Sequence, residues 1–185
     1  MRLVRANHSK SGIINIGFPY TIPGQAGVKG VEMVNYGWKQ HAKHSDKTNA
    51  TRQADLSKGG LISQVIFGES AIDLMSFYEL NKDKLPFDQS LLVGTGGGLS
   101  QNQITNILQT HPEASIHTAF DNDLAGNVYD IKVAAFQLDK ELIMRKDGDT
   151  ITVNLPASEK EFTLKESNLT LTNFRKLSGL RPSLT

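Results

Sequence analysis

Three acidic side chains stand where apolar runs of the chain end. Glu69 closes the run at 64–68, and Asp121 and Asp123 follow the run at 115–120. Because Asp121 and Asp123 are two positions apart, their side chains point the same way on an extended segment. Mg²⁺ prefers oxygen ligands and often uses one or two carboxylates together with substrate phosphates. The spacing predicts a divalent-metal site on Asp121, Asp123 and Glu69, with Glu69 also as the catalytic acid or base of phosphoryl transfer.

Each of these acids also has a structural explanation. Glu69 could stabilise the dipole of a helix over 70–81. One of the two aspartates could form the N-cap of the helix that begins near Leu124. A cap needs only one aspartate, so the second favours metal coordination. Asp73 and Asp130, each one turn into a predicted helix, are expected to be surface acids.

A glycine-rich turn and a basic flank could bind phosphate. The turn at 94–98 precedes a helix beginning near Ser100, where backbone N–H groups can approach an anion, although the glycines could equally serve only a tight turn. The first 60 residues hold nine of the 20 Lys and Arg residues but only three of the 19 acids. This asymmetry fits nucleic-acid binding and a solvated basic face equally well. The candidate phosphate or nucleic-acid contacts are Gly94, Thr95, Gly96, Lys29, Lys39 and Lys43.

The elements that must position these residues alternate between strand and helix. Runs rich in Ile, Val, Leu and Phe predict strands at 61–69, 90–93 and 115–120. Helical spacing of apolar residues follows each strand, at 70–81, 100–111 and 125–145. Ser100 and Gln103 have the spacing of a capping box. Three successive βα units predict an α/β fold with a parallel sheet flanked by helices.

The segments on either side of this core have a different pattern. Before it, residues 13–22 and 28–38 predict a hairpin, and the polar residues 41–60 a long loop. After it, the alternation over 149–165 predicts a second hairpin, and residues 169–180 a short helix. The core is therefore expected to lie between two β-rich parts.

Composition limits the class of protein. A chain of 185 residues fits one domain with a small appendage. It has no apolar run near the roughly 18 residues of a membrane span, and its first five residues lack the apolar core of a signal peptide. We therefore expect a cytoplasmic protein without a membrane partner. Because cysteine is absent, disulfides and cysteine-based zinc sites are excluded.

Three motifs taken together resemble the Toprim domain. They are Phe67-Gly68-Glu69-Ser70-Ala71-Ile72-Asp73, then Gly94-Thr95 with Leu99-Ser100-Gln101-Asn102-Gln103, then Asp121-Asn122-Asp123-Leu124-Ala125-Gly126. The resemblance covers roughly residues 61–145 and is specific, because the motifs occur in the right order on the right elements. Within that superfamily the chain most resembles the primase-like branch, which includes Toprim proteins of plasmids, conjugative transposons and phages.

The resemblance implies a function and an organisation. The function is Mg²⁺- or Mn²⁺-dependent, primase-like phosphoryl transfer on nucleic acid, in mobilisation or replication of a mobile element. Implied partners are single-stranded DNA or RNA, nucleotides, and other domains or mobilisation proteins. The implied parts are a basic β-rich N-terminal lobe at 1–60, a Toprim core at 61–147 and an extension of hairpin and short helix at 148–185.

Two departures from the primase-like pattern keep other functions open. Met33-Val34-Asn35 occupies the stretch where primase-like chains bring an arginine, and no Lys-Asp-x-Asn pattern follows the core. One alternative is a non-catalytic DNA-binding or interaction module of a conjugation complex. Another is a Toprim nuclease. A third is an unrelated α/β domain whose acids only cap helices.

Overall fold

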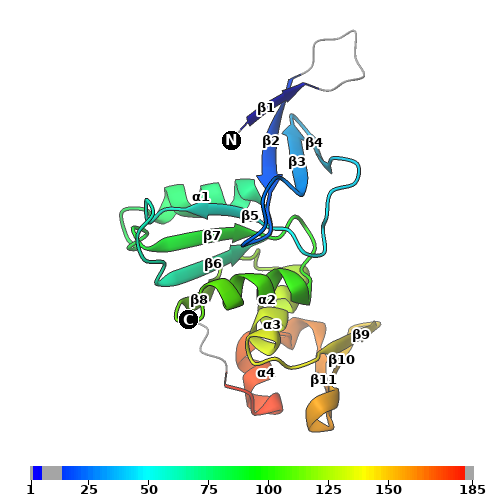
Figure 1. Cartoon of the computed structure of the whole chain (residues 1–185). Helices are drawn as coiled ribbons and strands as arrows, with labels where there is room; N and C mark the ends of the chain where they lie inside the picture. Colours follow the sequence, from blue (N-terminus) through cyan, green and yellow to red (C-terminus); the bar gives the residue numbers. More distant parts are fainter. Residues whose placement is uncertain (1, 6–13, 182–185) are drawn as a thin grey trace.

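The structure is a computed structural model and describes residues 2–5 and 14–181. Figure 1 shows an N-terminal sheet at the top, a layered α/β core in the middle, and a C-terminal sheet with a helix at the bottom. No helix in the described residues is long and apolar enough to cross a membrane. Position 13, at the start of the predicted first hairpin, lies outside the described residues.

The core sheet has four strands in the order β5-β7-β6-β8. They are β5 (Arg52–Asp55), β6 (Gln64–Gly68), β7 (Ser90–Gly94) and β8 (Ser115–Thr118). Strand β6 is parallel to both β7 and β8, as predicted. Strand β5 is antiparallel to β7, so the sheet is mixed. The prediction of a continuous loop over 41–60 is wrong at β5, whose Arg-Gln-Ala-Asp sequence has no apolar pattern and which is held by main-chain bonds to β7.

Helices cover both faces of the core sheet (Figure 1). They are α1 (Ala71–Asn81), α2 (Gln101–Thr110) and α3 (Leu124–Gln137). Leu74 of α1 packs with Ile66 and Leu92 on one face. On the other face, α2 and α3 pack on the side chains that alternate with these along β6 and β7. Ser100 and Gln103 form the predicted capping box.

The N-terminal sheet is a four-stranded antiparallel meander in the order β1-β2-β3-β4. Its strands are β1 (Arg2–Arg5), β2 (Ile14–Tyr20), β3 (Gly30–Asn35) and β4 (Trp38–His41). The predicted first hairpin is confirmed in the pairing of β2 with β3. A bridge between Thr21 and Thr51 connects this sheet to the start of β5. The lobe is thus joined to the core sheet by backbone pairing.

The C-terminal part is a three-stranded sheet in the order β11-β10-β9, followed by a helix. Its elements are β9 (Ile143–Asp147), β10 (Thr150–Leu155), β11 (Lys160–Lys165), α4 (Leu171–Ser178) and 3-10 turns at Pro156–Ser158 and Glu166–Asn168. The second hairpin and the short helix are confirmed. Ile151, Val153 and Phe174 belong to the same apolar cluster as Ile131 of α3. The extension therefore shares the hydrophobic core.

The prediction of a helix extending to residue 145 is wrong beyond Gln137. Asp139 has a positive φ of 51°, and the Lys140 N–H bonds back to the Ala135 carbonyl, which ends the helix in a tight turn. Residues 143–147 then pair with β10 as strand β9. The sequence Ile-Met-Arg-Lys-Asp is compatible with either conformation, and pairing with β10 decides in favour of a strand.

Candidate metal and phosphate site

Glu69 is held at the end of β6 by the glycine-rich turn. Its carbonyl oxygen accepts the N–H groups of Gly96 and Gly97, at N···O distances of 2.7 and 3.2 Å. Its carboxylate lies near Gly97, because a Cβ added there would be 3.7 Å from Glu69 Oε1. The turn that follows β7 therefore wraps around the predicted catalytic acid.

Asp121 and Asp123 follow β8, the neighbour of β6 on its other side. The Ala119 N–H bonds to the Phe67 carbonyl at 2.7 Å, so the chain stays beside β6 up to the aspartates. Asp123 is the N-cap of α3, and its Oδ1 accepts the Gly126 N–H at 2.8 Å. A Cβ at Gly126 would lie 1.8 Å from the Asp121 carbonyl oxygen. The Asp-x-Asp and Ala-Gly residues thus form one turn that only glycine can complete.

The acids share one electrostatic environment. Burial raises the pKa of Glu69, the positive charge of Lys39 lowers it, and the negative charges of Asp73, Asp121 and Asp123 raise it further. The carboxylates that follow β8 therefore contribute to the raised pKa of the carboxylate that follows β6. Asp73 also accepts a hydrogen bond from Ser70 Oγ at 2.5 Å at the start of α1.

The donor set fits a divalent cation, although the side chains do not yet converge on one. No three His, Asp or Glu side chains among the described residues are close enough to hold a metal ion as they stand. The three predicted ligands supply only carboxylate oxygens, which suit Mg²⁺ or Mn²⁺. Repulsion among these carboxylates is the kind of energy that a bound cation offsets.

Of the three predicted phosphate-binding lysines, Lys39 approaches the acids. Its Nζ lies 3.3 Å from Glu32 Oε1, and its charge acts on Glu69. Lys29 acts on Asp46, where it contributes to lowering the pKa of that carboxyl after the hydrogen bonds from Asn49 and Thr48. Lys43 is exposed in the loop between β4 and β5.

Gly94, Thr95 and Gly96 are engaged in holding the turn. Gly94 and Thr95 are buried, and the Thr95 N–H bonds to the Gly68 carbonyl at 3.1 Å. Gly96 has a positive φ of 82° and faces the N-terminal lobe. A Cβ at Gly96 would lie 2.8 Å from His41 Cε1 and 2.9 Å from the Tyr20 hydroxyl. The glycine at this position is required by its backbone and by its neighbours.

A buried polar cluster in the N-terminal lobe was not predicted. The Tyr20 hydroxyl donates to Glu32 Oε2 at 3.2 Å, and Glu32 is fully buried. Burial and the Glu32 charge raise the pKa of Tyr20. The ring of His41 packs edge-on against Tyr20 at 5.3 Å. One signal was available in the sequence, because Glu32 is an acid inside the apolar stretch Val31 to Val34.

A second group of residues that the sequence did not predict surrounds a hollow of about 310 Å³ beside the glycine-rich turn. We call it the glycine hollow; its walls are residues 96–100, Lys47, Thr48, Tyr129 and Lys132. The Tyr129 hydroxyl donates to the Gly97 carbonyl at 3.2 Å. Burial, followed by the charges of Glu69 and Asp123, raises the pKa of Tyr129. The glycine hollow therefore borders the acids.

Asp130 differs from its expected position at the surface. It lies on α3 and is partly buried, and burial raises its pKa, while a hydrogen bond with the Thr118 side chain opposes the shift. Asp130 thus contributes to the packing of α3 against β8.

Comparison with protein families gives a match to this part of the chain. The family model that matches, over residues 66–156, is described as Toprim-like. A Toprim-like domain spans residues 66–156. Toprim domains act on nucleic acids and generally bind Mg²⁺, and Glu69, Asp121 and Asp123 all lie within the Toprim-like domain. The predicted resemblance is confirmed in this general form. No match to the chain is found among curated proteins or among solved structures.

Proposed function

We propose that this protein is a cytoplasmic, Mg²⁺-dependent, primase-like enzyme that transfers phosphoryl groups on nucleic acid during mobilisation or replication of a mobile element. The observation that carries the proposal is the position of Glu69, Asp121 and Asp123, which follow the carboxyl ends of two adjacent parallel strands, β6 and β8. Ligands of open α/β sheets bind at this edge.

The residues would divide the chemistry between them. Asp121, Glu69 and the Asp123 oxygen that does not cap α3 would hold Mg²⁺ or Mn²⁺. A bound ion would supply positive charge to the phosphate that reacts. Glu69, whose pKa is raised by burial and by its acidic neighbours, is suited to accept or return a proton. Gly94, Thr95 and Gly96 fix the turn that positions Glu69.

The N-terminal lobe would guide the nucleic acid. Lys39 lies nearest the acids, while Lys29 and Lys43 extend the positive charge along the lobe. Phosphate neutralisation by such lysines supplies most non-specific affinity. In this proposal residues 1–60 bind single-stranded DNA or RNA, residues 61–147 carry out chemistry on it and on nucleotides, and residues 148–185 form an extension that meets further domains or mobilisation proteins.

One observation favours a second function, a non-catalytic nucleic-acid-binding module. Asp123 Oδ1 is already used as a helix cap, and the described acids do not converge into a ready metal group. Such a module would bind a strand equally well with and without Mg²⁺. A Toprim nuclease remains the enzymatic alternative, distinguished by its product rather than by its metal.

Titration calorimetry with Mg²⁺ and Mn²⁺ tests the proposal directly. Wild type should bind metal, and Asp121→Asn and Glu69→Gln should lose most of that affinity. Asp88→Asn is the matched control. Asp88 is an exposed acid just before β7, so it lies at the amino end of that strand, away from the carboxyl ends that the three acids follow. Primer-synthesis and strand-cleavage assays on the same proteins then separate primase from nuclease. Metal binding that survives in Asp121→Asn, or no binding by wild type, would reject the enzymatic proposal.

A further inference from the structure

Lys132 is a partly buried cation on α3 that has no ion-pair partner in the part of the chain that the structure describes. Burial lowers the pKa of its ammonium group. Its Nζ lies 5.8 Å from the centre of the Tyr129 ring. None of the ion pairs found among the described residues includes it. Because burying an unpaired charge is unfavourable, this position would be stabilised by an anion from outside the chain.

Lys132 is also the residue shared by two hollows. One is the glycine hollow beside the acids. The other, of about 450 Å³, lies between α3 and the edge strand β9 and is called here the strand hollow. Its walls include Leu124, Val128, Ile143, Met144, Arg145 and Lys146. Leu124, one of these walls, directly follows the metal-ligand candidate Asp123 in the chain.

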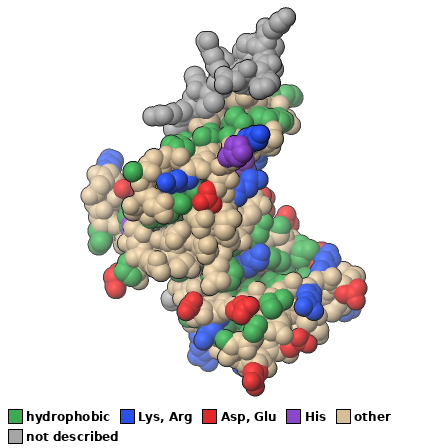
Figure 2. Space-filling model, turned by 45° about the vertical axis from the view of Figure 1, so that its right-hand side comes forward, with side chains coloured by type: hydrophobic (Ala, Val, Ile, Leu, Met, Phe, Trp, Pro, Cys, Tyr) green, Lys and Arg blue, Asp and Glu red, His purple; other side chains and the backbone are tan. Residues whose placement is uncertain are grey.

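The surface of the strand hollow combines apolar side chains with cations. Figure 2 shows hydrophobic side chains gathered where the core meets the C-terminal part, with Lys and Arg side chains beside them. Of the two basic residues of β9 that line it, Lys146 pairs with Glu166 at 2.5 Å. Arg145 is exposed. The cations of the two hollows thus follow one another from Lys47 through Lys132 to Arg145.

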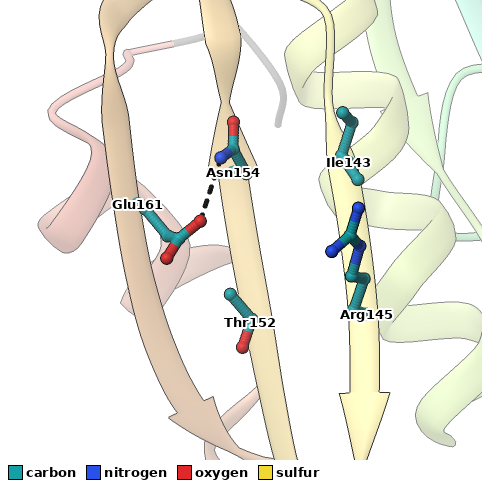
Figure 3. A pocket seen from close by; sticks show the side chains of 5 residues that line it. All are labelled: Ile143, Arg145, Thr152, Asn154 and Glu161. Atoms are coloured by element: carbon teal, nitrogen blue, oxygen red, sulfur yellow. Dashed lines mark hydrogen bonds between the residues drawn. The ribbon is translucent and has the colours of Figure 1, made fainter.

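Beyond β9 the character of the surface changes. Ile143 and Arg145 also line a hollow of about 220 Å³ with Thr152, Asn154 and Glu161. Figure 3 shows their side chains beside one another on β9, across from Thr152 and Asn154, with Asn154 bonded to Glu161 at 3.0 Å. The acid on β11 repels phosphate, so the cationic path ends at Arg145.

A single strand of nucleic acid matches the cations and apolar side chains that line the two hollows. Its phosphates would meet the cations, and its bases, which a duplex keeps stacked inside, would contact the ring of Tyr129 and the apolar side chains of α3 and β9. A peptide added along the edge of β9 would need no cation at Lys132. The partly buried, unpaired ammonium therefore favours the nucleic acid.

We propose that a single strand leaves the acid site across the glycine hollow, sets a phosphate against Lys132 and lays its following bases in the strand hollow towards Arg145. The path rests on the proposed function, because the strand is the one on which the acids would act. It adds the C-terminal extension to the nucleic-acid-binding surface and makes Lys132 the residue that joins extension to core.

Fluorescence anisotropy with a labelled single-stranded oligonucleotide tests the path, at several salt concentrations and without divalent metal. Lys132→Met should weaken binding about 5- to 10-fold and lower the salt slope by about one. Ile143→Glu, at an exposed position of β9, should also weaken binding. Lys84→Met, an exposed lysine after α1, should leave binding unchanged. The thermal midpoint of Lys132→Met should not fall, because methionine fills the same space without a buried charge.

The outcomes separate the path from the proposed chemistry. If Lys132→Met binds the single strand as tightly as wild type or Lys84→Met does, the path is wrong, whether or not the acids bind metal. The path is also wrong if Lys132→Met weakens the binding of a duplex of the same sequence by an equal factor. If Lys132→Met weakens strand binding while wild type binds no metal, the path holds and the enzymatic function fails. The proposed path would also be overturned if a peptide bound in place of the strand and Lys132→Met did not change that binding.

Discussion

The imidazole Nε2 of His41 lies 3.0 Å from the carbonyl oxygen of Gly96. The N–H of the same glycine donates to the carbonyl of Glu69 at 2.7 Å. A single residue of the turn therefore contacts both the N-terminal lobe and the catalytic candidate. Movement of the lobe against the turn would shift Glu69, so the position of the acid depends on the packing of His41.

Replacing Gly96 by alanine should destabilise the protein by about 1–3 kcal/mol. The new Cβ would lie 2.8 Å from His41 and 2.9 Å from the Tyr20 hydroxyl, at a backbone φ of 82° that disfavours side chains. Gly98→Ala is the matched control, because a Cβ there meets no atom within 4 Å. Urea denaturation measures both variants. Equal stability of the two would show that the lobe does not press on the turn.

Asp123 can be tested separately as a helix cap and as a metal ligand. Asp123→Ala removes the acceptor of the Gly126 N–H and should cost about 1 kcal/mol of stability. Asp123→Asn keeps a capping oxygen and should cost only a few tenths of a kcal/mol. Both should weaken Mg²⁺ binding, measured by calorimetry. If Asp123→Asn binds Mg²⁺ as wild type does, Asp123 is a cap alone.

The raised pKa of Glu69 predicts a pH-dependent effect on stability. The folded state holds the Glu69 proton more tightly than the unfolded chain does. Ionised Glu69 therefore destabilises the fold at neutral pH, and this penalty disappears as the pH falls through the raised folded pKa. Glu69→Gln should raise the thermal midpoint at pH 7 and lose that advantage in acid. Mg²⁺ should raise the midpoint of wild type more than that of the variant.

The exposed Glu113, in the turn after α2, provides the control for this experiment. Glu113→Gln should leave the thermal midpoint at pH 7 close to that of wild type. A Glu69→Gln variant that is less stable than wild type at neutral pH would contradict the destabilising effect of ionised Glu69.

The pair of Lys39 with buried Glu32 should behave as one unit. Lys39→Met leaves a fully buried carboxylate without its cation and should cost about 2–4 kcal/mol. Glu32→Gln in the same chain removes the charge, can keep the bond from Tyr20, and should restore much of that loss. A double-mutant cycle by chemical denaturation gives the coupling. Lys43→Met, on the same lobe but exposed, should change stability little; strictly additive effects would show that the pair is not coupled.

The parts of the fold with strong apolar patterns were predictable. The runs that form β6 and β7 bury nearly every side chain, so a continuous apolar run reveals them, and β8 buries Ile116. Strand β5 was missed because its sequence is polar, and β9 because its sequence is compatible with a helix; main-chain pairing with β7 and β10 defines them. Such pairing leaves no periodic signal in the strand itself.

The carboxylates of the candidate site were predictable because the order of strands and helices along the chain predicts which strand ends meet. Glu69, Asp121 and Asp123 stand at the ends of parallel strands, so their proximity follows from the topology. The contacts of Tyr20 and His41 with Gly96 join segments more than 50 residues apart, and those of Lys47 and Lys132 depend on the shape of a hollow. Neither leaves a motif in the sequence.

The position of β5 has a consequence for how this protein could vary. Arg52–Asp55 follows the lobe in sequence, yet it covers the edge of β7, and buried Gln103 of α2 binds the Ala50 carbonyl just before it. A chain that began after this strand would expose an open β-edge of the kind that promotes self-association. Lobe and core are therefore expected to be inherited, lost or exchanged together, as a single evolutionary unit.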